Sequence, residues 1–449
     1  MNFEKKMKQR GNSNIDAKTP QLYEKPHQSF PLWAKIVIPS WTAVLATAIT
    51  LAVVIPNLNS VQSHINPKYD SSYFATAPKE KAIQNLDASV VSRTATKTLE
   101  NLDSYFADRN NKDYVLSPAS YLLAASAVAA VSDGFDLSAF GLVDASKDTK
   151  TLLSSWNFLF EKNSTYEKAC CQFDSGVLHQ QVGAKYRFDD EKRKAIADDY
   201  IATSVASLND YHQQATDYFH NHVGLTIPIP DPGLRSDGVI TYGALKMKDY
   251  VPNGFGTKKN DFYIGNNVIQ VETREFGSTF EPLPISYYEG TNYQAFQMNI
   301  AATSLLIILP SESVSLESVS VSEAYTSFMA NRETRYSIGY VPYFHLRTAL
   351  EDLTSAMLHR LTGKEVFFSK LLADDVENRL ALDSVLQTSD FEFNQYGVAG
   401  ESITVMSYTE TAAPQEHEVI KLYVNRPFYA ISLKDNFPLF VNKVNNPGQ

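Results

Sequence analysis

The sequence predicts an α+β fold for residues 88–449, with helices first and then large antiparallel or mixed sheets. Helical patterns dominate before Gly224 and strand patterns after it, whereas βαβ units would alternate along the chain. The composition is that of a globular protein, with 44% hydrophobic and 20% charged residues. No internal repeat is visible, so a repeat architecture is not expected.

The clearest helix signal covers residues 117–131, an alanine-rich apolar segment. It begins with Ser117 and Pro118, which suit the cap and the first turn of a helix. Further helices are expected at 89–107, 187–202, 209–222 and 348–361. Strands are expected at 239–247, 268–275, 293–300, 304–309 and 336–346.

The last sixty residues combine strands with one long irregular segment. Phe391 and Phe393 alternate with polar residues, which predicts a half-buried strand. A long segment of small and polar residues opens near Gly397, and the strand pattern resumes as IKLYV, RPFYAISL and PLFVNKV. Loops held between the strands of a rigid scaffold often carry recognition, so this segment is a candidate functional site.

Residues 34–55 are predicted to form one transmembrane helix that precedes the domain, because residues 36–55 carry no charge. Lysines are frequent before this segment, and the twenty residues after it carry only Lys68. This asymmetry makes residues 1–33 a cytoplasmic tail and residues 56–87 an extracytoplasmic spacer at the cell membrane, with the main domain outside. A cleaved signal peptide is the competing interpretation. It would need a shorter apolar core and a cleavage site of small residues.

Several classes of function are disfavoured. The net charge of −10 argues against nucleic-acid binding. No Ser-x-x-Lys, Gly-x-Ser-x-Gly or His-Glu-x-x-His motif occurs, so we expect no enzyme. The two cysteines, Cys170 and Cys171, are adjacent, which excludes a disulfide framework. The spacing of His212, His220 and His222 favours a solvated helix face over a metal site, and no metal or cofactor is expected.

Several segments resemble, in order along the chain, the signature strings of one known protein family. YVLSPASYLLAASAVAA (114–130) is similar to the family's "NVFFSPLSIS-AL", and SLLIILPSES (304–313) to "SMLIILPDE". YVPYFHLRTALEDL (340–353) is similar to the family's "LPKFKIE--YDLKDVL". The end of the chain resembles the "(H/R)PF" strand and the closing strand in Arg426, Pro427, Phe428, Leu439, Phe440, Lys443, Val444, Asn446 and Pro447. The resemblance is to the serpin family, covers residues 88–449 and implies a serpin-like fold with an exposed reactive-centre loop.

A serpin inhibitor presents this loop as bait and then inserts it as an extra strand of a sheet. The resemblance places Gly397 at the loop hinge. Because a strand alternates its faces, one set of hinge side chains turns inward. The inward set is Val398, Gly400, Ser402 and Thr404. All four are small and uncharged, and the one charged neighbour, Glu401, belongs to the outward set, which is the pattern that insertion requires.

The resemblance also assigns the shutter region, where the receiving sheet opens. Its residues here are Ser117, Pro118, Ser120, Gly243 and Gln387. Gly243 replaces an asparagine of the family, and Gln387 stands where the family often has histidine. Glutamine can still donate and accept hydrogen bonds. The polar network of the shutter is therefore altered.

The bait has two candidate positions. Counting from the hinge gives Thr411 and Ala412, whereas counting back from Pro427 gives Glu416 and His417. No lysine or arginine lies between Gly397 and Lys421, so the expected partner is a serine or cysteine protease that is not trypsin-like. The alternative is a non-inhibitory serpin-fold binding or carrier protein at the cell surface. A monomer is expected in both cases.

Overall fold

The structure is a computed structural model. It describes most residues of 88–142, 171–180, 203–208, 225–227, 239–354, 384–398 and 418–448, with short pieces at 189–192, 367–370 and 380–381. The predicted tail, transmembrane helix and spacer lie outside the described residues, as do the helix expected at 209–222 and nearly all of that expected at 187–202. Within the described part of the chain, no helix is long and apolar enough to span a bilayer.

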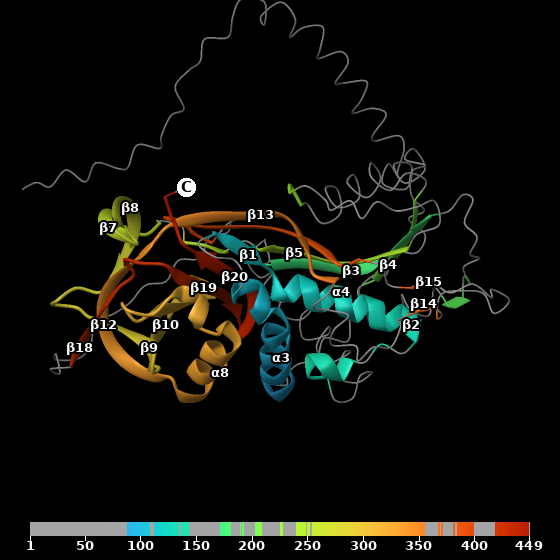
Figure 1. Ribbon diagram of the computed structural model, residues 1–449, viewed down its shortest axis with the longest axis horizontal. Coiled ribbons are helices and arrows are strands. Elements are labelled where there is room, and N and C mark those ends of the chain that lie inside the picture. The colour runs from blue at the N-terminus through green and yellow to red at the C-terminus, as the bar shows by residue number, and fades with distance from the viewer. Residues whose placement is uncertain are drawn as a thin grey trace, which may run out of the picture. The chain divides into compact units, whose positions relative to one another are not determined.

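Three helices are described, α3 (Ala88–Ala107), α4 (Pro118–Val131) and α8 (Val321–Asn331), with the short 3-10 turns η2 (Leu137–Phe140) and η5 (Leu316–Ser318) (Figure 1). Serine side chains cap the N-termini of two of these helices. The Ser117 side chain accepts a hydrogen bond from the Ser120 amide at the start of α4, and Ser320 caps α8 in the same way. Because Pro118 occupies the first turn of α4, the missing N–H of proline costs nothing there.

The largest sheet has the order β1-β20-β19-β11-β10-β9-β12-β8-β7, and β18 pairs with β12 beside this path (Figure 1). It is mixed, because β18 runs parallel to β12 and the other pairs are antiparallel. Its strands are β1 (Tyr114–Leu116), β7 (Thr257–Ile264), β8 (Asn267–Phe276), β9 (Leu283–Glu289), β10 (Tyr293–Asn299), β11 (Ser304–Pro310), β12 (Glu333–Pro342), β18 (Val419–Tyr423), β19 (Phe428–Lys434) and β20 (Phe437–Val444).

The core lies where this sheet meets the helices. Every residue of β11, β19 and β20 is buried. Phe106 of α3 packs edge-to-face against Tyr429 of β19, with ring centroids 6.1 Å apart. Two such rings bury a large apolar area and also prefer this geometry. The strands that follow the candidate loop therefore belong to the most buried part of the domain.

An ion pair between a buried lysine and a partly exposed glutamate stabilises this region. The Lys443 ammonium, on β20, is fully buried, lies 2.8 Å from the Glu317 carboxylate and donates to the Phe106 carbonyl oxygen at 3.1 Å. Burial raises the pKa of Glu317, but the hydrogen bonds from Lys443 and Ser315 and the charge of Lys443 outweigh it and lower that pKa to about 2. The pair ties the end of the chain to α3 and η5.

Two further sheets lie edge to edge. One has the order β4 (Thr203–Leu208), β3 (Cys171–Gln180), β5 (Val239–Met247). The other has the order β13 (Phe344–Asp352), β16 (Leu386–Asn394), β17 (Gly397–Val398), β6 (Asp249–Tyr250). Residues of β5 and β16 line a cavity between the two sheets. Only one residue separates β5 from β6, so the chain itself links the two sheets. A small fourth sheet among the described residues has the order β15 (Leu380–Ala381), β14 (Phe367–Phe368), β2 (Ser132–Asp133).

Most of the expected elements are confirmed where the structure describes them, but two expectations are wrong. The strand expected at 336–346 is two strands, because the chain leaves the large sheet at Tyr343 and enters the second sheet as β13. The helix expected at 348–361 is a strand as far as Asp352, since β13 pairs with β16 over this segment. Pairing across the sheet overrides the helical propensity of TALED there.

Candidate functional site

The gap between β5 and β16, called the slot from here on, is the candidate functional site. Strand β5 pairs with β3 along one edge, and within the described residues no strand pairs with its other edge. Strand β16 pairs with β13 along its length and with β17 only at its last residues. Unpaired strand edges readily accept another strand. The slot thus presents two facing edges with room for one strand between them.

Strand β17 already occupies one end of the slot. It is antiparallel to both neighbours, with Gly397 opposite Asn394 and Tyr250, and Val398 opposite Phe393 and Asp249. The Val398 side chain is 1% exposed. The first two residues of the candidate loop therefore form a strand inside the sheet.

The chain reverses direction just before β17. The Val251 amide donates to the Tyr396 carbonyl oxygen at 2.6 Å, and the Phe255 amide donates to the Gln395 carbonyl oxygen at 2.5 Å. Gly397 has φ of +128°, a backbone conformation that residues with a Cβ rarely adopt. A glycine is thus required where the loop turns back into the sheet.

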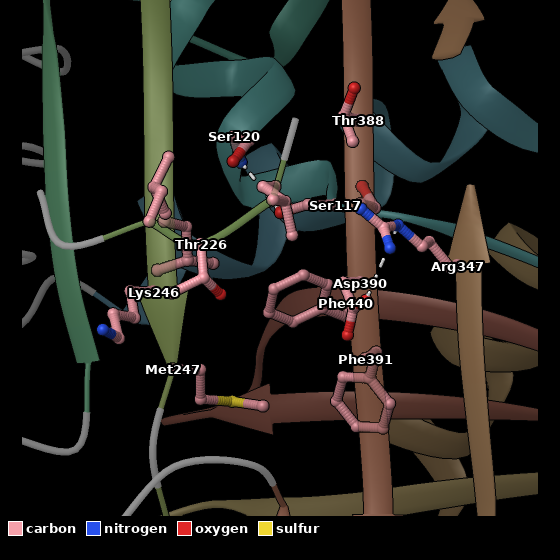
Figure 2. A pocket seen from close by; sticks show the side chains of 14 residues that line it. Ser117, Ser120, Thr226, Lys246, Met247, Arg347, Thr388, Asp390, Phe391 and Phe440 are labelled. Carbon is pink, nitrogen blue, oxygen red and sulfur yellow. Dashed lines mark hydrogen bonds and ion pairs between the residues drawn. The ribbon is translucent and has the colours of Figure 1, made fainter. Parts of the chain in front are cut away.

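A cavity of about 240 Å³ continues the slot beyond β17. Figure 2 shows Lys246 and Met247 on one side of it, Asp390 and Phe391 on the other, and Ser120 behind them. Its remaining lining residues are Ser117, Leu225, Thr226, Ile227, Leu245, Arg347, Thr388, Ser389 and Phe440. The lining of the cavity therefore mixes apolar, hydroxyl and charged side chains.

A polar network lies beneath the slot. The Ser117 amide donates to Gln387 Oε1 at 2.7 Å, and Gln387 Nε2 donates to the Ser117 carbonyl oxygen at 3.0 Å. The Ser389 hydroxyl donates to the same Oε1 at 3.1 Å, and the Ser117 hydroxyl donates to the Leu439 carbonyl oxygen at 2.8 Å. The glutamine side chain thus joins β16 to the start of α4 through two reciprocal bonds.

On the other side of the slot, α4 comes very close to β5. A Cβ added to Gly243 would lie 2.4 Å from the Ser120 carbonyl oxygen and 2.6 Å from the Ala124 amide nitrogen. Any side chain there would push α4 away from the sheet. Gly243 is therefore needed for the close packing of α4 on β5. The polar side chain between the sheet and α4 comes instead from Gln387 on the other side of the slot.

The outer rim of the slot carries charges of both signs. His345 Nε2 lies 2.9 Å from the Asp390 carboxylate, and Arg347 Nε lies 3.9 Å from it. Lys246 projects from β5 on the opposite side (Figure 2). A strand in the slot would thus have cationic and anionic groups within reach of its outward side chains.

The structure brings together Gly397, Val398, Ser117, Pro118, Ser120, Gly243 and Gln387 around one slot. The other hinge residues, Gly400, Ser402 and Thr404, and the bait candidates, Thr411, Ala412, Glu416 and His417, lie outside the described residues. So do His212, His220 and His222, and among the residues that are described no group of three His, Cys, Asp or Glu side chains could hold a metal ion. Sequence reasoning missed Asp249, because nothing near it marks a role.

Comparisons with known proteins find one matching family and several solved structures with a similar fold. Residues 253–447 match the model of the family described as serpin (serine protease inhibitor). The mouse protein-Z dependent protease inhibitor has a similar structure, with 16% identity, a TM-score of 0.59 and 81% and 98% of the two chains covered. The structure of human thyroxine-binding globulin in complex with its ligand is 16% identical in sequence, with a TM-score of 0.59 and with 81% of this chain and 100% of the other covered. The thermophilic serpin tengpin in its native state is 15% identical, with a TM-score of 0.60 and with 84% of this chain and 100% of the other covered. No curated protein sequence matches the chain.

Proposed function

We propose that the chain is a serpin that inhibits a protease by inserting its cleaved reactive loop into the slot. The support is the match of residues 253–447 to the serpin family and the similarity of the fold to solved serpin structures. The observation that carries this proposal is β17. This two-residue strand lies inside the sheet next to a cavity that is lined by both β5 and β16, so it is in position to be extended.

We extend the register of β17 to the loop residues that follow it. Continuing it residue by residue puts Gly400 between Met247 and Phe391, both of which line the cavity. Ser402 would lie between Leu245 and Ser389. Thr404 would lie between Gly243 and Gln387, with its hydroxyl beside the polar network. Residues directly opposite each other in a sheet share a face. Since Leu245, Met247, Ser389 and Phe391 are buried, these loop residues would point inward.

Inhibition then needs no catalytic group of its own. The nucleophile of the protease attacks the carbonyl carbon of the bait residue, an acyl-enzyme ester or thioester forms, and the next residue leaves as a free amine. The released loop extends β17 and removes the attached protease from its working geometry before water can cleave the acyl bond. We place the bait within Thr411–His417, where the absence of lysine and arginine points to a serine or cysteine protease that is not trypsin-like.

The test is incubation with a panel of extracellular proteases that prefer small or acidic residues. We expect a complex that survives denaturing electrophoresis, and the form cut within Thr411–His417 should melt at a clearly higher temperature than the intact protein. The reason is that a new central strand pairs two open sheet edges and buries the inward side chains.

The carrier interpretation is favoured by the likeness to thyroxine-binding globulin, although that likeness concerns the fold. It predicts the opposite outcome in the same assay. Clean cleavage without a complex, and a melting temperature that cleavage leaves unchanged, would establish a loop that does not insert.

We further propose that residues 34–55 anchor the protein in the cell membrane with the serpin domain outside. The support is the lysine excess before the uncharged residues 36–55. Protease added to intact cells should remove the domain and leave a tag at the N-terminus protected. A soluble product shortened at the N-terminus in untreated cells would contradict the anchor and support a cleaved signal peptide.

A further inference from the structure

Asp249 is a buried carboxylate next to the hinge. It lies in β6, directly opposite Val398 in the register, and is 4% exposed. Its oxygens accept four hydrogen bonds, from the amides of Ala301, Ala302 and Thr303 at 3.1, 2.9 and 2.8 Å and from the Thr303 hydroxyl at 2.6 Å. Bonds of this kind to a carboxylate are among the strong ones in proteins.

The group that Asp249 holds belongs to the large sheet. Residues 300–303 form the turn between β10 and β11, closed by the bond from the Ile300 amide to the Thr303 carbonyl oxygen. The turn is fixed from β19 as well, because Lys434 Nζ donates to the Ala302 carbonyl oxygen at 3.0 Å. The Asp249 side chain thus ties β6 to a rigid part of a different sheet.

The backbone around Asp249 forms one wall of the hinge. Asp249 and Tyr250 pair with β17, and the next residue, Val251, donates its amide to the Tyr396 carbonyl oxygen. Within the described residues, β6 has β17 as its only strand partner. Its position therefore depends on the chain on either side of it and on the four bonds to the turn.

We infer that Asp249 is the positioning residue that keeps the hinge docked in the slot, so that insertion starts from a strand already in register. The effect on inhibition rests on the proposed function, whereas the docking of the hinge by Asp249 does not. An undocked hinge would have to find its register after cleavage, and slower insertion leaves more time for the acyl-enzyme to hydrolyse.

The variant D249N keeps the size of the side chain. It removes the charge and turns one acceptor into an NH2 group that faces amide donors. The matched control is D103N. The Asp103 carboxylate likewise accepts bonds from the Ser320 hydroxyl at 2.7 Å and the Ser322 amide at 3.0 Å, but these hold the start of α8. T303V is a milder variant that removes only the hydroxyl bond to Asp249.

The first measurement is hydrogen exchange of residues 395–398 in the intact protein, by mass spectrometry. We expect D249N to speed exchange of this segment about tenfold, T303V less, and D103N not at all, because losing charge-assisted bonds favours local opening. Equal exchange in D249N, D103N and the unmodified protein would overturn the inference. If D249N does not fold, T303V against D103N decides in the same way.

The second measurement is the number of inhibitor molecules consumed per protease inactivated. It should rise several-fold in D249N and stay unchanged in D103N. If the unmodified protein forms no complex at all, the proposed function fails, while the exchange result still tests whether Asp249 docks the hinge. Faster hinge exchange in D249N with an unchanged number would overturn the link between docking and inhibition.

Discussion

Replacing Ser402 with arginine is expected to convert the protein from an inhibitor into a substrate of its target protease. In the inserted loop that we propose, continuing the register of β17 would put Ser402 on the inward face between Leu245 and Ser389. An arginine there would place an unpaired charge in the cavity at a cost of several kcal/mol. Each ~1.4 kcal/mol added to the insertion barrier slows insertion about tenfold, so hydrolysis of the acyl-enzyme would win.

The neighbouring replacement, E401R, is the control. The same continued register would put residue 401 of the inserted loop on the outer face between Lys246 and Asp390. Glutamate at this position would pair with Lys246, whereas arginine would pair with the Asp390 carboxylate. Loop insertion should therefore tolerate the E401R replacement. The readout is the number of inhibitor molecules consumed per protease inactivated. Equal numbers for S402R and E401R would show that the alternation from Val398 to Thr404 is not that of an inserting strand.

Replacing Lys443 with methionine should give the largest loss of stability. The change leaves Glu317 without its cation and the Phe106 carbonyl oxygen without its donor. Removing one partner of a fully buried pair typically costs about 3–5 kcal/mol. The cost here should lie towards or below the lower end of that range, because Glu317 is 20% exposed and keeps the hydrogen bond from the Ser315 hydroxyl. The control is K97M, whose pair with Glu100 is exposed and worth at most about 1 kcal/mol. Urea unfolding of both variants measures the difference.

The acid dependence of the same pair has a definite sign. The folded-state pKa of Glu317 is lowered to about 2 from the usual 4.5, so the pair stabilises the fold above pH 4.5. This stabilisation is lost as the pH falls from 4.5 towards 2. The advantage of the unmodified protein over E317Q should therefore shrink across that interval. A constant difference from pH 7 to pH 3 would contradict the assigned pair.

Parts of the fold could be predicted because their signals are local. The start of α4 is marked by a serine cap followed by proline, and β5 follows the predicted range of 239–247. The passage from β12 to β13 has no such mark. Apolar and β-forming residues continue through Tyr343, so only the change of partner strands shows the break.

The site divides in the same way. Gly397 and Gln387 could be singled out because each occupies a place that the family's pattern defines. The two-residue strand β17 could not be predicted, since it exists only by pairing with two segments distant in sequence. Asp249 is a similar case. Its hydrogen-bond partners lie 52 to 54 residues further along the chain, and an aspartate inside an otherwise strand-like segment gives no hint of them.

The place of β19 and β20 bears on how the chain folds during its synthesis. These strands come last in the sequence, yet every residue in them is buried, and β20 pairs with β1, more than three hundred residues earlier. The ribosome must therefore have synthesised residues up to 444 before the main core can close. Until β19 has been made, one edge of β11 has no partner strand. Unpaired apolar strands are prone to aggregate. A newly made chain should thus depend on chaperones throughout translation, and a premature stop before residue 428 should leave no folded domain.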